Sequence, residues 1–198
     1  MSQPQRASIG ARRNPETETA VLDAAAAIIR KDGFGRLTME SVARRAQAGK
    51  ATVYRWWPSR AHLLLALYSR AKSALEEPDT GDMVQDLTLY LHQMLGQLTG
   101  RDGQEPLAPM LRLLIAEAQM DDTIRQALQK ERDERWRHIC NILRRARDRG
   151  ELTPALTLRQ AETRIIAPIW YLLLNDSLPG PEGAGDLVAA MLADLRAR

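Results

Sequence analysis

The sequence predicts an all-α protein of about nine helices, with an amino-terminal helix-turn-helix domain and a larger carboxy-terminal helical domain. Two observations lead to this prediction. Apolar residues recur three and four positions apart along nearly the whole chain, and Gly, Pro, Asn and Asp separate the stretches in which they do so. The 198 residues are enough for a sizeable core in one domain or two.

Residues 1–13 are polar and lack the apolar block of a signal peptide, so we expect a disordered arm. Asn14 as a cap and Pro15 at the first helical position predict a helix that ends at Gly33. The apolar face of this helix consists of Val21, Leu22, Ala25, Ile28 and Ile29. We expect it to support the two short helices that follow.

A helix-turn-helix motif is predicted at residues 38–57. Thr38 is a good cap for a first helix over residues 39–46, and a second helix is predicted over residues 50–57. In the break between them, Gly49 lacks the Cβ that would obstruct a tight turn or a close approach to phosphate.

The second helix has one face for packing and one for contact. Val53 and Trp57 are four positions apart and are expected to pack on the preceding helix. The outward side chains combine a methyl group, a hydroxyl, a phenol, a guanidinium and an indole: Ala51, Thr52, Tyr54, Arg55 and Trp56. This combination suits the major groove of DNA and its flanking phosphates, although a short helix pair with core aromatic residues is the alternative.

Reach and chemistry suggest a role for each outward side chain. Ala51 and Thr52 can meet a thymine methyl or another base-edge group, and Arg55 can fork onto guanine O6 and N7. The residues expected at the phosphate and sugar backbone are Thr38, Gly49, Lys50, Tyr54, Trp56 and Arg60.

The charge of the chain is divided unevenly. Residues 1–72 hold thirteen Lys or Arg against five Asp or Glu, a net charge of +8, whereas residues 73–198 hold fifteen against twenty, a net charge of −5. The overall charge of +3 therefore conceals a strongly basic amino-terminal module, which indicates double-stranded DNA as the partner. The arm at residues 1–13 either contacts the DNA or is simply unstructured.

Residues 14–72, and above all the run Lys-Ala-Thr-Val-Tyr-Arg-Trp-Trp-Pro-Ser-Arg at 50–60, resemble the amino-terminal domain of the tetracycline-repressor-like (TetR) family of bacterial transcription regulators. The resemblance implies a regulator, by default a repressor, that a small molecule releases from its operator. Residues 73–198 are similar to the family only as a helical architecture. In the turn, members often have Gly-Val-Ser where this chain has Gln47-Ala48-Gly49.

The two predicted domains meet at a linker. Ser59 is expected to cap a fourth helix, whose apolar period continues to Leu75 and which leaves the DNA-binding module. The Pro-Asp-Thr-Gly run at residues 78–81 is the clearest linker. We therefore predict a DNA-binding domain at residues 14–77 and a ligand-binding and dimerisation domain at residues 78–198.

Five more helices are predicted in the carboxy-terminal domain, over residues 82–99, 106–120, 121–149 and 157–174 and from residue 186 onward. Thr157 and Gln160 have the spacing of a capping box at the fourth of these, and Pro168 is expected to kink it.

The second half of the helix at residues 157–174 is apolar around most of its circumference, so we expect a partner subunit to cover it, and this helix and the last one to form a four-helix bundle with their symmetry mates. The predicted dimer interface is Ile165, Ile169, Leu172, Leu173, Leu187, Met191 and Leu195. A homodimer also follows from the expected DNA contact. One short helix reads only a few base pairs, whereas a two-fold dimer reads a palindrome with half-sites about 34–36 Å apart.

A regulator needs a switch between two states. In a dimer, a small molecule can supply it by binding better when the two DNA-binding modules have one spacing than when they have another. The candidate lining of a cavity is Met83, Met94, Met110, Leu113, Trp136, His138 and Trp170. Ordinary core packing is the alternative for each of them. Their mostly apolar character favours a hydrophobic or aromatic effector.

Other classes of protein fit less well. The sequence has no Gly-rich phosphate loop and no recognisable catalytic set, so we expect no enzyme, no catalytic residue, no metal and no cofactor. Glu134 and His138 have the spacing of half a metal site, but no second pair completes it. A structural helical dimer is the other alternative, and it leaves the basic module unexplained.

Cys140, the single cysteine, excludes an intramolecular disulfide and fits a reducing compartment. We expect it to be a small buried residue, with a redox-sensing thiol as the alternative. No apolar run is long enough to span a membrane. The expected location is therefore the cytoplasm, in association with the nucleoid.

Overall fold

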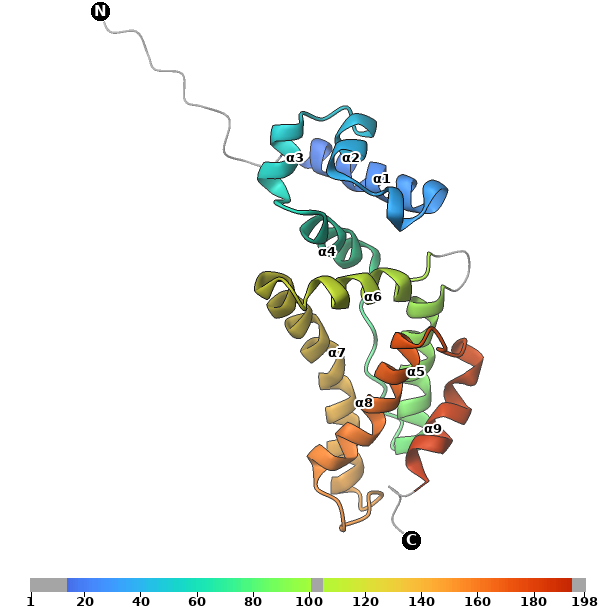
Figure 1. Cartoon of the computed structure of the whole chain (residues 1–198). Coiled ribbons are helices and arrows are strands. Elements are labelled where there is room, and N and C mark those ends of the chain that lie inside the picture. Colours follow the sequence, from blue (N-terminus) through green and yellow to red (C-terminus); the bar gives the residue numbers. More distant parts are fainter. Residues whose placement is uncertain (1–13, 101–104, 194–198) are drawn as a thin grey trace, which may run out of the picture. The chain divides into compact units, whose positions relative to one another are not determined.

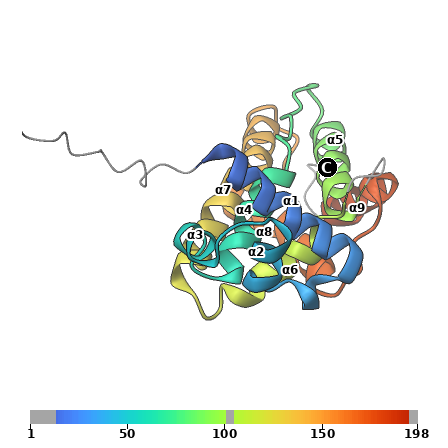
Figure 2. The ribbon, with the colours of Figure 1, turned by 90° about the horizontal axis from the view of Figure 1, so that it is seen from above.

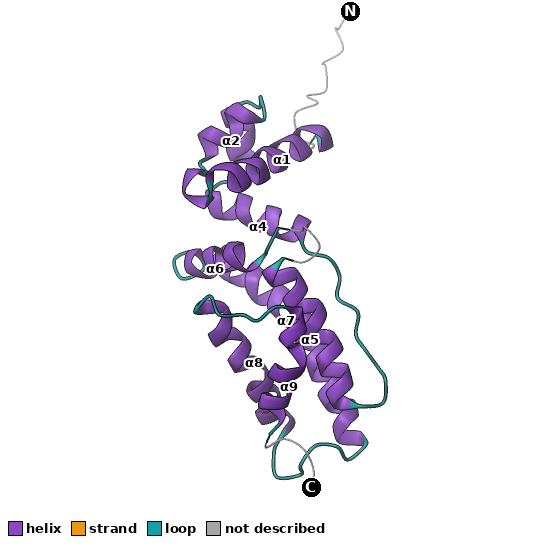
Figure 3. Ribbon diagram, turned by 90° about the vertical axis from the view of Figure 1, so that its right-hand side faces the viewer, coloured by secondary structure: helices purple, strands orange, loops and turns teal. Residues whose placement is uncertain are grey.

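The computed structural model describes residues 14–100 and 105–193, and in these ranges the chain forms nine α-helices, two 3-10 helices and no β-strand (Figures 1 and 3). This confirms the predicted all-α class. The chain divides into two compact units after Ser69. The arm predicted at residues 1–13 lies outside the described residues.

Helix α1 (Pro15–Asp32) begins and ends where the sequence predicted. The Asn14 side chain accepts a hydrogen bond from the Glu16 amide at 3.0 Å, and the Gly33 amide donates to the carbonyl four residues earlier at 2.9 Å. The buried face consists of Val21, Leu22, Ala24, Ala25 and Ile28. A 3-10 helix, η2 (Phe34–Arg36), follows it and was not predicted.

Helices α2 (Met39–Arg45) and α3 (Lys50–Trp56) form the predicted helix-turn-helix, and α2 packs on both α1 and α3 (Figure 2). Val42 of α2 and Val53 of α3 are fully buried, and Trp57, directly after α3, is 2 % exposed. Burying one such side chain contributes roughly 1.5–3 kcal/mol. Because isolated helices shorter than about 12 residues are marginal in water, this packing is what keeps α2 and α3 helical.

The turn between α2 and α3 takes its unusual conformation at Gln47, whose φ is 52°. The Gln47 amide donates to Arg44 O at 3.3 Å and the Ala48 amide to Ala43 O at 3.0 Å, which is the Schellman closure of a helix. Gly49 was predicted to keep the tight turn clear by lacking a Cβ, but its φ of −63° is one that any residue can adopt, and a Cβ there would meet only Thr52 Oγ1, at 3.7 Å. That part of the prediction was wrong: the left-handed residue is Gln47, where members of the resembled family often have Gly.

We expect Gln47→Gly to stabilise the protein. A side chain in the left-handed region costs about 1–2 kcal/mol, and the greater freedom of glycine in the unfolded chain offsets about 0.5–1 kcal/mol of that relief. The free energy of urea unfolding should therefore rise by about 0.5–1 kcal/mol. Helix α7 (Asp122–Asp148) closes with the same pair of bonds and has Gly150 at this position, with φ of 78°.

The matched control is Ala48→Gly at the next position, where φ is not positive and glycine should only destabilise. Equal losses of stability in both variants would contradict the claim that Gln47 is strained.

The second unit contains helices α5 (Met83–Thr99), α6 (Ala108–Glu117), α7, α8 (Leu158–Leu174) and α9 (Ala184–Leu192). Helices α5 and α8 each pack on both α7 and α9, so these four helices enclose the core (Figure 1). The five predicted helices are confirmed, and their ends differ from the prediction by only a few residues. Thr157 and Gln160 form the predicted capping box, and α8 continues past Pro168 to its end.

Most of the residues predicted to form the dimer interface are buried inside a single chain. Ile165, Ile169, Leu173 and Met191 are no more than 7 % exposed. They are core residues of the second unit, so they have no surface left to offer a partner, and the prediction needs this correction. Leu172 and Leu187 are half-buried, and Leu195 lies outside the described residues.

A different face of α8 is apolar and exposed. Tyr171 is 67 % exposed and Leu174 53 % exposed, and Ala167 lies one turn before Tyr171 on the same side. The helical period had indicated that α8 is apolar nearly all round, but it could not indicate which side the rest of the chain covers.

Between α4 (Arg60–Ala71) and α5 the chain runs without helix over residues 72–82, which we call the strap (Figure 3). The apolar period had predicted that the fourth helix continues to Leu75. Instead, the Ser73 carbonyl accepts from a side-chain amide of α5 at 3.0 Å, and the Glu76 amide donates to another α5 side chain at 3.0 Å. Because α5 offers these partners, the strap does not need the hydrogen bonds of a longer helix.

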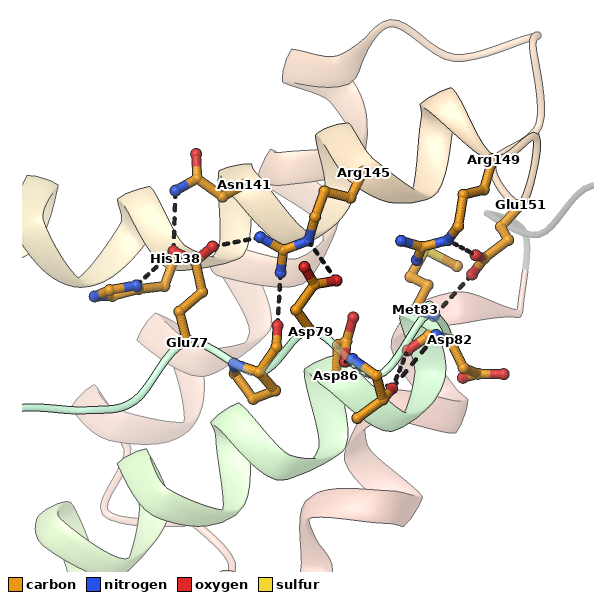
Figure 4. Close-up of polar contacts among 12 residues, drawn as sticks. Glu77, Asp79, Asp82, Met83, Asp86, His138, Asn141, Arg145, Arg149 and Glu151 are labelled. Carbon is orange, nitrogen blue, oxygen red and sulfur yellow. Dashed lines mark hydrogen bonds and ion pairs between the residues drawn. The ribbon is translucent and has the colours of Figure 1, made fainter.

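Glu77 fastens the strap to α7 (Figure 4). One carboxylate oxygen accepts from His138 Nδ1 at 2.7 Å and Asn141 Nδ2 at 2.9 Å, and the other accepts from Arg145. The Arg145 guanidinium also donates to the Pro78 carbonyl at 2.6 Å, and its Nε lies 3.3 Å from Asp79 Oδ1. The run that the sequence marked as a free linker is thus held by polar contacts.

A second polar anchor lies at the end of the strap. Asp86 is fully buried, and its Oδ1 accepts from both the amide and the hydroxyl of Thr80, at 2.7 and 2.8 Å. The Met83 amide at the start of α5 donates to Glu151 Oε2 at 2.7 Å. The strap therefore belongs with the second unit, whereas residues 72–77 were predicted to lie in the first domain.

The Glu77 contacts make stability depend on pH. Burial opposes ionisation of Glu77, but the bonds from Arg145, Asn141 and His138 outweigh it and lower the pKa of this carboxyl. A pKa that is lower in the folded state stabilises the fold above the unfolded-state value of about 4.3, and this contribution is lost as the pH falls through the folded-state pKa.

We expect Glu77→Gln to lower the free energy of unfolding by about 1–3 kcal/mol at pH 7, because charge-assisted bonds are lost and an amide group then faces three donors. The deficit should shrink as the pH falls below about 4. Glu76→Gln is the matched control, since Glu76 is an exposed neighbour and surface changes typically stay within about 0.5 kcal/mol. Urea unfolding between pH 3 and pH 7 checks both; a deficit independent of pH would contradict the ionic role of Glu77.

Candidate nucleic-acid interface

The exposed side of α3 carries Lys50, Ala51, Tyr54 and Arg55. Tyr54 and Arg55 follow Ala51 by three and four positions, so both lie on the same face of the helix as Ala51. Tyr54 is 42 % exposed although it is aromatic. The predicted outward orientation is confirmed for Ala51, Tyr54 and Arg55. Together with Lys50 they present an amine, a methyl group, a phenol and a guanidinium.

Thr52 and Trp56 lie at the edges of this face. Both were predicted to point outward, but each is half-buried. The Trp56 ring meets the ring of Trp57 edge to face, with centroids 5.8 Å apart and planes at 77°. Because Trp57 is buried, it braces Trp56 at the border between core and surface.

The start of α2 is closed by its own side chains. Thr38 Oγ1 accepts from the Ser41 amide at 3.0 Å, and Ser41 Oγ accepts from the Thr38 amide at 3.0 Å, which forms a reciprocal capping box. Thr38 is the helix cap that the sequence predicted. Two amides that could have served an anion are already bonded within the chain, so any contact of Thr38 with phosphate has to come from its exposed hydroxyl.

Sequence reasoning did not single out Glu40 as part of the site. Tyr54 donates its phenolic proton to Glu40 Oε1 at 2.9 Å, which joins α2 to α3 at the surface. This hydrogen bond is the main cause that lowers the pKa of Glu40, to which Lys50 adds, and it raises the pKa of Tyr54. The bond spans fourteen positions, a separation that the helical period does not reveal.

Further cations lie around this surface. Arg60 is exposed at the first position of α4, where the Ser59 hydroxyl accepts from the His62 amide at 3.4 Å. A hollow of about 460 Å³ beside Thr38 is lined in part by Arg36, Arg44 and Arg45. These three arginines contribute to the net charge of +8, and the sequence indicated no individual role for them.

The structure brings together some of the residues proposed to line an effector cavity. The Trp136 and Trp170 rings lie parallel, with centroids 6.1 Å apart and planes at 7°, and both are half-buried. His138 lies against Tyr90 with ring centroids 5.5 Å apart and is bonded to Glu77.

The methionines of that set are more dispersed. Met83, Met94 and Met110 are buried, and Leu113 is half-buried. Met83 and Met94 belong to the same helix, and at 1.5 Å per residue they are roughly 16 Å apart along its axis. These two do not line one small cavity.

Cys140 is half-buried rather than buried. Burial raises the pKa of its thiol to about 11, and a contact with Glu162 adds to the shift. At neutral pH the side chain is therefore a thiol rather than the thiolate that a redox sensor requires. Among the described residues, no three His, Cys, Asp or Glu side chains are grouped as a metal site, and no helix there is long and apolar enough to cross a membrane.

A short helix packed through Val53 and Trp57, with a basic and hydrogen-bonding outer face, defines a helix-turn-helix DNA-binding protein. Comparison with known proteins agrees. Residues 21–67 match the family model for bacterial regulatory proteins of the TetR family, and residues 77–193 match the tetracyclin repressor-like carboxy-terminal domain.

The chain is 30% identical over 167 residues to the HTH-type transcriptional regulator YdeS of Bacillus subtilis, covering 83% of this chain and 82% of that protein. It is 32% identical over 101 residues to the HTH-type transcriptional repressor KstR of Mycobacterium tuberculosis, covering 50% of this chain and 46% of KstR. The crystal structure of the TetR family regulator SCO0332 is similar, with a TM-score of 0.61 and 28% identity over 90% of this chain and 98% of that one. The chain belongs to the TetR family of transcription regulators.

Proposed function

We propose that this protein is a ligand-responsive transcriptional repressor that binds a palindromic operator as a homodimer and leaves it when a small molecule binds. The observation that carries the proposal is the exposed face of α3, held above the buried Val53 and Trp57 in a module of net charge +8. The likeness to the repressor KstR supports repression. We assign DNA binding to residues 14–77 and ligand binding and dimerisation to residues 78–198, and expect a cytoplasmic, nucleoid-associated protein.

Within the reading head, the side chains divide by chemistry. We assign Ala51, Thr52 and Arg55 to base edges, because a methyl group, a hydroxyl and a forked guanidinium are suited to the major groove. The side chains assigned to the DNA backbone are Thr38, Lys50, Tyr54, Trp56 and Arg60, with Gly49 allowing a close approach.

A homodimer is supported by the apolar surface that the chain leaves uncovered. Tyr171 and Leu174 are exposed on consecutive turns of α8. A second subunit packed on this side of α8 would remove their apolar surface from water. We assign the dimer contact to this face, with the half-buried Leu172 and Leu187 beside it. A dimer would place two reading heads on half-sites about 34–36 Å apart.

An aromatic or hydrophobic effector is supported by the parallel pair of Trp136 and Trp170. Both rings are half-buried and belong to helices that pack on each other, α7 and α8. Flat, half-buried aromatic rings at a contact between two helices suit an aromatic ligand. The family membership supports a regulator over an enzyme or a purely structural dimer, because the relatives that match are named as transcriptional regulators.

The direct test is binding to duplex DNA over a range of salt concentrations. Phosphate contacts release counterions, so log Kobs should fall linearly with log salt, with a slope of about −0.9 per contact. Footprinting on the DNA upstream of its own gene should protect a palindrome. A protein that binds no duplex at low salt would exclude the proposal, and protection without two-fold symmetry would exclude the dimeric reading.

Arg55→Ala and Tyr54→Phe should separate base contacts from backbone contacts. Loss of Arg55 is expected to cost about 1–3 kcal/mol on the operator and to relax the preference at one base pair. Tyr54→Phe should instead weaken binding to all duplexes alike, since a phosphate contact carries no sequence information. Competition binding with single-base operator variants measures both; a uniform loss in the Arg55 variant would move Arg55 to the backbone group.

Tyr171→Glu should prevent dimerisation, because a carboxylate would be buried in the apolar contact on α8 without a partner. Sedimentation equilibrium should show a monomer, and affinity for the palindrome should fall toward that for a single half-site. Met120→Glu is the matched control: Met120 is 90 % exposed and lies outside α8. A Tyr171 variant that stays dimeric would place the contact elsewhere.

A further inference from the structure

Glu40 is an anion on a surface that the proposed function assigns to anionic phosphates. Its carboxylate is exposed and accepts the phenolic proton of Tyr54 at 2.9 Å, and Lys50 acts on it electrostatically. Tyr54 and Lys50 are two of the side chains that we assign to the DNA backbone. The acidic group is therefore engaged with the same side chains that DNA is to engage.

The hydroxyl of Tyr54 has one proton and can donate only one good hydrogen bond. In the free protein that proton goes to Glu40. A phosphate oxygen and an ionised carboxylate are both acceptors, so they cannot share the proton, and they repel each other. A contact in which Tyr54 donates to phosphate requires that its bond to Glu40 first be broken.

We propose that Glu40 is a negative determinant of DNA affinity: it holds the hydroxyl proton of Tyr54 and must release it before Tyr54 can donate to a DNA phosphate. This inference rests on the proposed DNA-binding function. It adds to that function a residue that lowers the affinity for DNA. The effect acts on phosphate contacts, so it lowers affinity for every sequence alike. A regulator with this carboxylate dissociates more readily from non-specific DNA, and its affinity for the operator depends more on base contacts.

The capping role of Thr38 is separate from this effect. Thr38 and Ser41 satisfy each other at the start of α2, and neither bond involves the Glu40 carboxylate. Glu40→Gln keeps the length of the side chain and an amide oxygen that can still accept, so it removes the charge without opening α2. The change therefore separates the effect on DNA from an effect on folding.

The test measures binding of the full chain to a random-sequence duplex of about 30 base pairs, at several salt concentrations. Glu40→Gln replaces the carboxylate by a neutral amide, which does not repel phosphate and holds the Tyr54 proton less strongly, so affinity should rise about three- to tenfold for each DNA-binding module. Glu16→Gln is the matched control: it removes one exposed carboxylate from the first turn of α1, as Glu40→Gln does from the first turn of α2, and should change affinity much less.

The same substitution in the Y54F background identifies the mechanism. With no phenolic proton to release, Glu40→Gln should give a clearly smaller gain there than in the presence of Tyr54. Equal gains in the two backgrounds would overturn the role of the hydroxyl, and an unchanged or lower affinity in Glu40→Gln alone would overturn the proposal. Carbon-13 NMR of the tyrosines gives an independent check, because the raised pKa of Tyr54 should fall when Glu40 no longer carries a charge.

Failure of this inference is distinguishable from failure of the proposed function. Wild-type protein that binds no duplex at low salt contradicts DNA binding itself. Wild-type protein that binds, with a Glu40→Gln variant no tighter than it, contradicts only the role of Glu40.

Discussion

The burial of Val53 and Trp57 is the constraint on which the DNA-facing surface depends. Helix α3 has seven residues, too few for its internal hydrogen bonds to keep it helical in water. The two buried side chains, roughly 1.5–3 kcal/mol each by the area they remove from water, hold it against its neighbours. Because they are four positions apart, they also set the rotation of the helix about its axis. Lys50, Ala51, Tyr54 and Arg55 are exposed as a consequence.

In the second unit, polar side chains hold the strap in place. The strap at residues 72–82 has no helical hydrogen bonds of its own, and a buried unpaired backbone or charge is costly. Side chains of α5 and α7 supply the partners, and all three donors to Glu77 come from α7. The strap is therefore fixed to α7 at Glu77 and to α5 on either side of it, although it leads directly out of α4. Contacts of this kind are strong only while Glu77 is ionised, which gives this part of the fold its dependence on pH.

The helical period predicted the elements well, because the spacing of apolar residues determines which helices form and which residues of α3 are buried. The period predicted less well wherever the structure depends on hydrogen-bond partners or packing from segments distant in the sequence. Leu75 continues the period of the fourth helix, yet the strap replaces that turn because α5 and α7 offer partners. Ile165 and Leu173 were expected at a dimer interface, yet α7 and α9 cover α8 on that side. The left-handed residue of the turn is Gln47, whereas the turn was predicted to depend on the missing Cβ of Gly49.

Glu40 illustrates why a charge count alone cannot describe a binding surface. Thirteen cations in residues 1–72 predict attraction to DNA, and one carboxylate among them changes the net charge only slightly. Its position gives it a larger effect, because it is bonded to a side chain that is itself assigned to phosphate. In the free protein, Tyr54 is already hydrogen-bonded to Glu40, and DNA has to replace that bond. The affinity of the reading head depends on the difference between those two states, and the protein can lower it through the free state without altering any contact made with DNA.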